Sequence, residues 1–208
     1  MSILVLTSDT LSSPAAVGQI EYSSPIYAAT PIGTQRGIVP TQQYYRLESA
    51  RLVASTASAV SMFGVGATLS ASTVYEFEIS GLLNKTDGTT AHTLGFSIGG
   101  TATLNNLRYN IIEVDNTTGS SISAGTGIIS SSTASNTTFT TSTGANTTIF
   151  VPFLIKGTVS INAGGTFIPQ YTCSSAPGGS GWTTAIGTYI RINPLSASGA
   201  NTSVGTWS

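Results

Sequence analysis

Apolar and polar residues alternate at every second position over much of this chain. In residues 73–79, Tyr75, Phe77 and Ile79 fall on one side of an extended backbone and two glutamates on the other. A period of two is typical of a β-strand with one buried face. The same pattern predicts strands over residues 92–98, 107–114, 158–161, 166–171 and 185–192, and a near-continuous apolar run predicts another over residues 147–155. The side chains expected to face the core in these strands include Leu94, Phe96, Ile98, Leu107, Tyr109, Ile111, Ile186, Ile190 and Ile192.

The links between these strands carry turn residues. Asp87-Gly88 predicts a hairpin between the first two strands, because this dipeptide is typical of two-residue β-turns. The Asn-Ala-Gly-Gly stretch at residues 162–165 predicts a second hairpin. Pro152 predicts an edge strand or a β-bulge, because proline cannot donate a hydrogen bond to a ladder.

The whole pattern predicts an all-β protein. Residues 44–59 come nearest to a helix, but their Ser, Thr and Val content is equally compatible with a strand. Many short strands at a spacing of roughly 8–12 residues are typical of an antiparallel β-sandwich or jelly roll. We therefore expect a jelly-roll-like β-sandwich domain over residues 43–208.

Two segments depart from this pattern. Residues 1–42 contain four of the eight prolines and little sustained alternation, which predicts an extended N-terminal arm lying on a neighbouring subunit or shell. Residues 115–147 are rich in Ser, Thr, Asn and Gly. They form either a long loop or Thr-rich strands with hydroxyl groups on a wet face.

The composition narrows the class of protein. Charged residues make up 7% of the 208 residues, against roughly 25% in an ordinary domain, whereas Ser and Thr number 30 and 33. With 40% hydrophobic residues and a net charge of −1, the chain has little charge to keep a free monomer soluble, so we expect much of its surface to be buried in an assembly or covered by hydroxyl groups. It carries no basic surface for nucleic acid. No apolar run approaches the roughly 20 residues of a membrane span, and no signal peptide is evident, so we expect no membrane insertion.

Few residues are candidates for chemistry. Glu76 and Glu78 share a strand face, roughly 6.5–7 Å apart, which approaches a glycosidase acid pair; the alternative is a solvent-facing strand surface. His92 is a general base, a lone metal ligand or a hydrogen-bonded structural residue. Cys173 has no neighbouring base and predicts an inert thiol. We expect no enzyme activity, no metal site and no cofactor.

Contact residues are easier to propose than catalytic ones. Trp182 and Trp207 are candidates for stacking on a sugar, with a plug into the core or an interface as the alternative. The candidate contacts of the N-terminal arm are Ile3, Leu4, Val5, Leu6, Tyr22, Tyr27 and Arg36.

Several segments together resemble a known family. In order they are Gln19-Ile-Glu-Tyr22, Ile26-Tyr-Ala-Ala-Thr-Pro31, Arg36-Gly-Ile-Val-Pro-Thr41, Met62-Phe-Gly-Val-Gly-Ala-Thr-Leu69, Ser72-Thr-Val-Tyr-Glu-Phe-Glu78 and His92-Thr-Leu-Gly-Phe-Ser-Ile-Gly-Gly-Thr-Ala-Thr103. This order resembles a module of virion structural proteins from tailed bacteriophages, especially marine and cyanobacterial ones, often described as tail-fibre or minor structural proteins. The resemblance covers about residues 17–112, with Ser23-Ser24-Pro25 standing in place of the family's Tyr-Asp-Gly turn.

The resemblance implies a non-enzymatic protein of the virion surface, made in the host cytoplasm. Virion surface proteins of this size are commonly β-sandwich trimers, so the resemblance also implies a homotrimer. The first hypothesis is a capsid decoration or cement protein that contacts the major capsid protein or other virion proteins. The alternative is a tail-fibre or receptor-binding protein that recognises a host surface glycan. A glycan-cleaving enzyme is a more distant hypothesis, which rests on the two glutamates.

Overall fold

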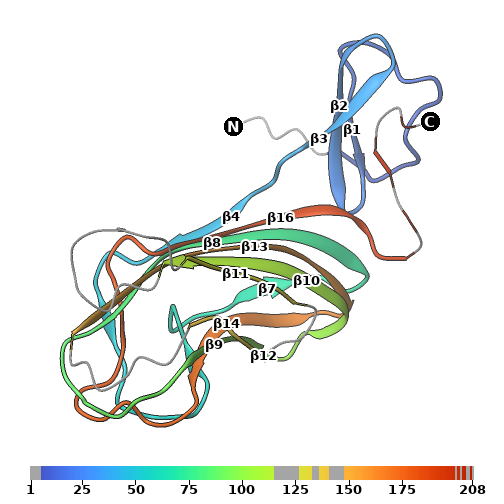
Figure 1. The fold of residues 1–208 in the computed structure, drawn as a ribbon. Coiled ribbons are helices and arrows are strands. Elements are labelled where there is room, and N and C mark those ends of the chain that lie inside the picture. Colours follow the sequence, from blue (N-terminus) through green and yellow to red (C-terminus); the bar gives the residue numbers. More distant parts are fainter. Residues whose placement is uncertain are drawn as a thin grey trace, which may run out of the picture.

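The computed structural model describes residues 6–114, 127–132, 136–140, 148–199, 201, 203, 204 and 207, and these residues contain strands and no helix (Figure 1). The predicted all-β class is therefore confirmed. An N-terminal sheet holds β1 (Ile20–Ser23), β2 (Ile26–Ile32) and β3 (Gln35–Val39). An eight-stranded sheet holds β4 (Gln43–Arg46), β5 (Arg51–Leu52), β8 (Thr73–Lys85), β10 (Thr103–Val114), β11 (Gly127–Ser132), β13 (Ile149–Ala163), β15 (Thr183–Thr184) and β16 (Tyr189–Ala197). A five-stranded sheet holds β6 (Val60–Ser61), β7 (Ala67–Leu69), β9 (Leu94–Gly99), β12 (Asn136–Thr138) and β14 (Gly165–Cys173).

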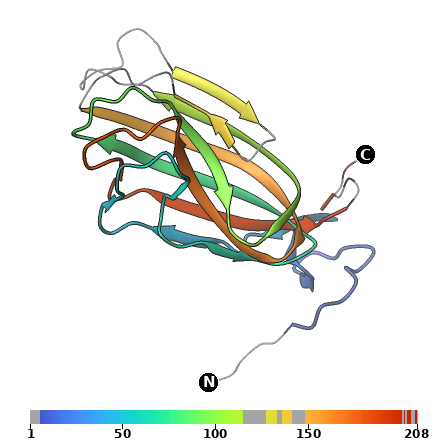
Figure 2. The same ribbon diagram turned by 90° about the horizontal axis from the view of Figure 1, so that it is seen from below.

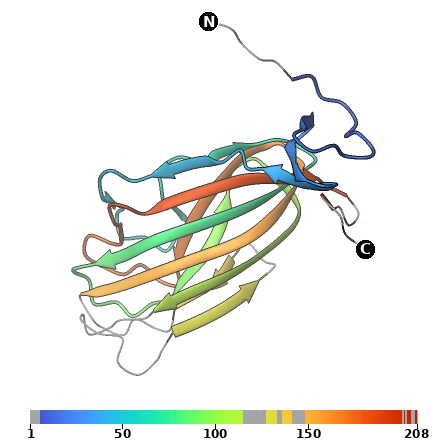
Figure 3. The ribbon, with the colours of Figure 1, turned by 90° about the horizontal axis from the view of Figure 1, so that it is seen from above.

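The two larger sheets form a sandwich of antiparallel strands. Figure 3 shows β4, β16, β8, β13, β10 and β11 side by side in one layer, and Figure 2 shows the molecule from the opposite side. Apolar side chains of both layers meet in one core, and Phe77 of β8, for example, packs on Phe167 of β14 with ring centroids 5.5 Å apart. The alternation predicted for residues 73–79 and 107–114 is confirmed, because Tyr75, Phe77, Ile79, Leu107, Tyr109 and Ile111 are all buried. The jelly-roll topology stays a prediction.

Both predicted hairpins are wrong. β8 and β9 do not pair with each other: β8 lies in the eight-stranded sheet and β9 in the five-stranded sheet. β13 and β14 are likewise joined by a tight link but belong to different sheets. Glycine allows the chain to turn at these links. It does not decide in which sheet the next strand pairs, because that depends on how the two sheets cover each other's apolar faces.

Hydroxyl groups fix a further crossing between the sheets, from β9 to β10. The link from β9 to β10 lies against the start of β14, where the N–H of Thr101 donates to Oγ1 of Thr166 and the N–H of Thr166 donates to Oγ1 of Thr101, both at 3.0 Å. Gly100 precedes this clamp at φ +109°, a conformation that other residues rarely adopt. A Cβ at this position would overlap the carbonyl oxygen of Thr166.

Other local expectations need correction. Pro152 lies in β13, which is a central strand, but pairing of β13 with β10 ends at Phe153, so the proline has no described ladder partner on that side. Ile186 is 60% exposed and precedes the last strand, because β16 begins only at Tyr189. Residues 44–59 contribute the short strands β4 and β5 and no helix.

The Ser/Thr-rich segment contains strands where the structure describes it. β11 pairs with β10, and β12 pairs with β9, which supports the Thr-rich strand alternative for these residues. Residues 115–126, 133–135 and 141–147 of the predicted loop lie outside the described part of the chain.

The N-terminal region is more folded than an extended arm. Residues 20–39 form the three antiparallel strands β1, β2 and β3, which stand beyond one end of the sandwich, near the end of β16 (Figure 1). The prolines did not prevent pairing, because Pro25 lies in the turn between β1 and β2 and Pro31 lies beside the irregular register near the end of β2.

The crossing at Gly100 should be sensitive to a single methyl group. We expect Gly100→Ala to lower the free energy of unfolding by about 3 kcal/mol or more, because backbone strain and overlap with Thr166 add. Gly187 has φ +86° and open space around its Cα, so Gly187→Ala should cost only about 1–2 kcal/mol of strain. Urea unfolding followed by circular dichroism measures both variants. Equal losses would show that the close approach to β14 does not matter.

Candidate functional site

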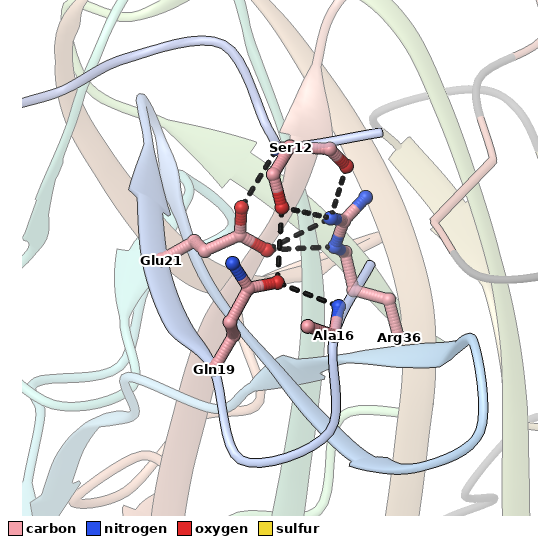
Figure 4. Close-up of polar contacts among 5 residues, drawn as sticks. All are labelled: Ser12, Ala16, Gln19, Glu21 and Arg36. Carbon is pink, nitrogen blue, oxygen red and sulfur yellow. Dashed lines mark hydrogen bonds and ion pairs between the residues drawn. The ribbon is translucent and has the colours of Figure 1, made fainter. Parts of the chain in front are cut away.

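A polar network attaches the chain that precedes β1 to the N-terminal sheet (Figure 4). Nη2 of Arg36 lies 2.8 Å from Oε2 of Glu21 and donates to the carbonyl oxygen of Ser12 at 2.7 Å. The N–H of Ser12 donates to Oε1 of Glu21, and its hydroxyl donates to Oε1 of Gln19. The hydrogen bond from the Ser12 N–H is the largest cause that lowers the pKa of Glu21, and Arg36 acts in the same direction. The network holds residues 12–16 against one face of the sheet.

Register divides the N-terminal sheet into two different faces. We call the face bearing Glu21, Ala28 and Ile38, which lie side by side on β1, β2 and β3, the covered face. It includes the buried residues Ile26, Ala28 and Thr30. The opposite face, which we call the open face, carries two rows of residues: Ile20, Ala29 and Gly37, then Tyr22, Tyr27 and Val39.

The open face is apolar and accessible. Ile20 is 65% exposed and Val39 is 38% exposed. The rings of Tyr22 and Tyr27 are half-buried and stack with centroids 4.7 Å apart. Outside these two rows, Ile32 at the end of β2 and Val17 before β1 are 65% and 63% exposed. Exposed apolar clusters of this kind mark interaction surfaces on soluble proteins.

The structure describes four of the seven residues proposed for the N-terminal arm and places them in different surroundings. Tyr22 and Tyr27 are register partners, Arg36 anchors the polar network, and Leu6 is half-buried just before it. Ile3, Leu4 and Val5 lie outside the described residues.

Trp207 lies beside this sheet. It borders a cavity shared with Ile38 of β3, Val74 and Leu195, its indole N–H donates to the carbonyl oxygen of Val204, and its side chain is 78% exposed. Trp207 is thus available for contact.

The proposal of Trp182 as a receptor contact is wrong. Trp182 is 1% exposed, and its indole N–H donates to Nε2 of His92 at 2.8 Å. Nδ1 of His92 lies 2.7 Å from the carbonyl oxygen of Thr90. Because a carbonyl only accepts and an indole N–H only donates, the proton of the neutral imidazole sits on Nδ1. His92 is the hydrogen-bonded structural residue of the three alternatives.

The loops around this pair close one end of the sandwich. Both carboxylate oxygens of Asp87 accept hydrogen bonds from Ser180, at 2.9 and 2.7 Å, and the N–H of Gly178 donates to Ser55. Burial is the main cause that lowers the pKa of His92, and nearby Lys85 adds to it.

The two glutamates on β8 do not form a glycosidase pair. Glu76 is exposed, but Glu78 is buried, with Oε2 at 2.6 Å from Lys156 and 2.9 Å from Arg191, while Oε1 accepts from the hydroxyl of Tyr189 at 2.9 Å. Burial would raise the pKa of Glu78, but these hydrogen bonds outweigh it and lower the pKa to about 2. Glu78 therefore cannot deliver a proton near neutral pH, and its oxygens are already engaged.

The remaining candidates for chemistry are not placed for a reaction either. Cys173 is buried, and burial raises the pKa of its thiol to about 11, which agrees with an inert side chain. Within the described ranges, no three His, Cys, Asp or Glu side chains gather as a metal site would require. The same residues include no helix with the length and hydrophobicity needed to cross a membrane.

Sequence reasoning missed Ser12 and Gln19 as parts of the network and Lys156 and Arg191 as partners of Glu78. One signal was present, since residues 1–42 contain only three charged residues, Asp9, Glu21 and Arg36. Two side chains of opposite charge, Glu21 and Arg36, in a segment with so few charges point to an ion pair between them.

Comparisons with models of protein families, with curated proteins and with solved structures find no match to this chain.

The polar network should control how firmly residues 6–19 are held. We expect Arg36→Ala to speed amide hydrogen exchange and protease cleavage in this segment, because Glu21 and the Ser12 carbonyl lose their partner. Arg46→Ala is the matched control, since the Arg46–Glu48 pair is exposed and should contribute little. Unchanged exchange in Arg36→Ala would contradict the anchoring role.

His92 should make stability depend on pH. The unfolded chain binds a proton as pH falls below about 6.5, whereas folded His92 resists protonation because its pKa is lowered. Stability is therefore complete above this pH and falls as pH decreases below it. We expect the urea midpoint of the wild type to drop between pH 7.5 and 5.5, with a smaller drop in His92→Gln. Equal drops would contradict the assignment, because the chain has a single histidine.

Proposed function

We propose that this chain is a non-enzymatic structural protein of a bacteriophage virion surface, most simply a capsid decoration or cement protein. In this role it binds the major capsid protein or other virion proteins, and it stabilises the head by burying surface area across the boundaries between subunits. The N-terminal sheet takes part in this assembly, and the sandwich projects from it.

The observation that carries the proposal is the open face of the N-terminal sheet. This face displays the exposed aliphatic side chains of Ile20 and Val39 beside two half-buried tyrosines, beyond the end of a sandwich that has its own core. A part of the chain that adds nothing to that core, yet presents apolar surface, is suited to holding a partner.

The surroundings of the candidate catalytic groups also support a structural role. The carboxylate pair has no proton donor at Glu78, the thiol is buried, and the histidine is committed to Trp182. The burial of Trp182 removes the main candidate for receptor contact in the loops at the far end of the sandwich. These facts favour attachment over catalysis or recognition by that end.

A receptor-binding role on the tail is the second candidate function. Exposed Trp207 favours it, as does a cleft of about 440 Å³ between the N-terminal sheet and the sandwich. The cleft carries no charged side chain and is lined by Tyr22, Ser24, Pro25, Thr41, Gln43, Ser70, Ala71, Thr73, Tyr75 and Pro194. Hydroxyl, amide and aromatic groups without charge suit a neutral glycan of the host surface.

Labelling of intact virions separates the two functions. We expect gold-labelled antibody against the purified chain to cover the head in electron micrographs, while antibody pre-absorbed with the protein gives no label. Label confined to the tail would favour the receptor-binding role. Absence of label from particles of a phage that encodes the chain would contradict both.

A further inference from the structure

We propose that the open face of the N-terminal sheet binds the same face of a second copy of this chain. The inference deepens the proposed function and rests on it for the role of this sheet as the assembly part. It names the partner of the sheet as a copy of this chain.

The first argument is the size of the sheet. Its three strands contain 16 residues. The segment around Ser12 lies against its covered face, and Ile38 of that face borders a cavity shared with Leu195 and Trp207. A small sheet of this kind needs cover on its apolar surfaces to be stable. Within the described chain, Tyr22 of the open face lines a cleft with Ser70 and Tyr75 of the sandwich, whereas Ile20 and Val39 of the same face stay exposed.

The second argument is the apolar exposure of the open face itself. Two of the large hydrophobic side chains that are exposed among the described residues, Ile20 at 65% and Val39 at 38%, belong to this face. Ile20 and Val39 lie in the two adjacent rows of the open face. An uncovered patch of this kind promotes association at moderate concentration.

The third argument is the distribution of charge. The open-face residues Ile20, Tyr22, Tyr27, Ala29, Gly37 and Val39 include no charged side chain, whereas Glu21 and Arg36 form their ion pair in the network on the other face. A partner rich in charge would lose the hydration of its charges here without gaining a counter-ion. A neutral apolar face matches its own copy, as a self-complementary interface requires.

The edge of the sheet at β3 is compatible with the packing of a second copy on the open face. On the β1 side, the N–H of Asp9 donates to the carbonyl oxygen of Tyr22, so preceding chain already lies there. Among the described pairings β3 has β2 as its one neighbour. The open face reaches this edge at Gly37 and Val39, and a second copy could approach it there without displacing the segment around Ser12.

The test is the mass of the full chain in solution. We expect light scattering after gel filtration to give two or more copies at about 50 μM, and Ile20→Asp to weaken association by roughly a hundredfold, because a charge would be buried without a partner. Ile186→Asp is the matched control, since Ile186 is 60% exposed, close to the 65% of Ile20, but lies on the sandwich. The control should keep the wild-type mass.

Two results would overturn the inference: a monomeric wild type at this concentration, or a multimer that Ile20→Asp leaves intact. Val39→Asp, on the same face, repeats the test if Ile20→Asp fails to fold, and circular dichroism shows which variants are folded. A monomer that still labels phage heads would overturn the inference but keep the proposed function. A multimer that labels no virion would overturn the proposed function alone.

Discussion

The apolar face of a β-sheet has to be covered, and this requirement shapes the whole molecule. In the sandwich the eight-stranded and five-stranded sheets cover each other around Phe77, Phe167 and their neighbours. The chain meets the requirement by crossing between the layers, from β8 to β9, from β9 to β10 and from β13 to β14. Glycine and threonine at these crossings let the backbones approach closely. The N-terminal sheet has a cover on one face, and its other face is the feature from which our account of assembly follows.

The small number of charged residues is a second constraint on the molecule. The chain has fifteen charged residues, and several are held in internal contacts instead of being spread over the surface. Glu78 is bound by Lys156 and Arg191, Glu21 is bound by Arg36, and Asp87 is bound by Ser180. These groups stabilise strands and loops, but they give little repulsion between copies. A protein with this surface is suited to a crowded assembly.

The sequence predicted the fold class and much of the core, because alternation in residues such as Tyr75, Phe77 and Ile79 allows one buried face. It did not predict strand partners, since Asp87-Gly88 encodes a turn but not the sheet to which the next strand belongs. The hydrogen bond between His92 and Trp182 joins residues ninety positions apart, so no local pattern reveals it. The N-terminal sheet was missed because its strands are short and interrupted by Pro25 and Pro31, although Ile26, Ala28 and Thr30 already alternate.

Hydrogen–deuterium exchange of the full chain at low and high protein concentration tests the central claim most directly, because it reports which backbone amides an assembly covers. If the open face is the assembly surface, peptides from residues 17–39 will exchange more slowly at high concentration, whereas peptides from β8 and β13 will not change. Protection that grows over the sandwich and leaves residues 17–39 unchanged would contradict the account.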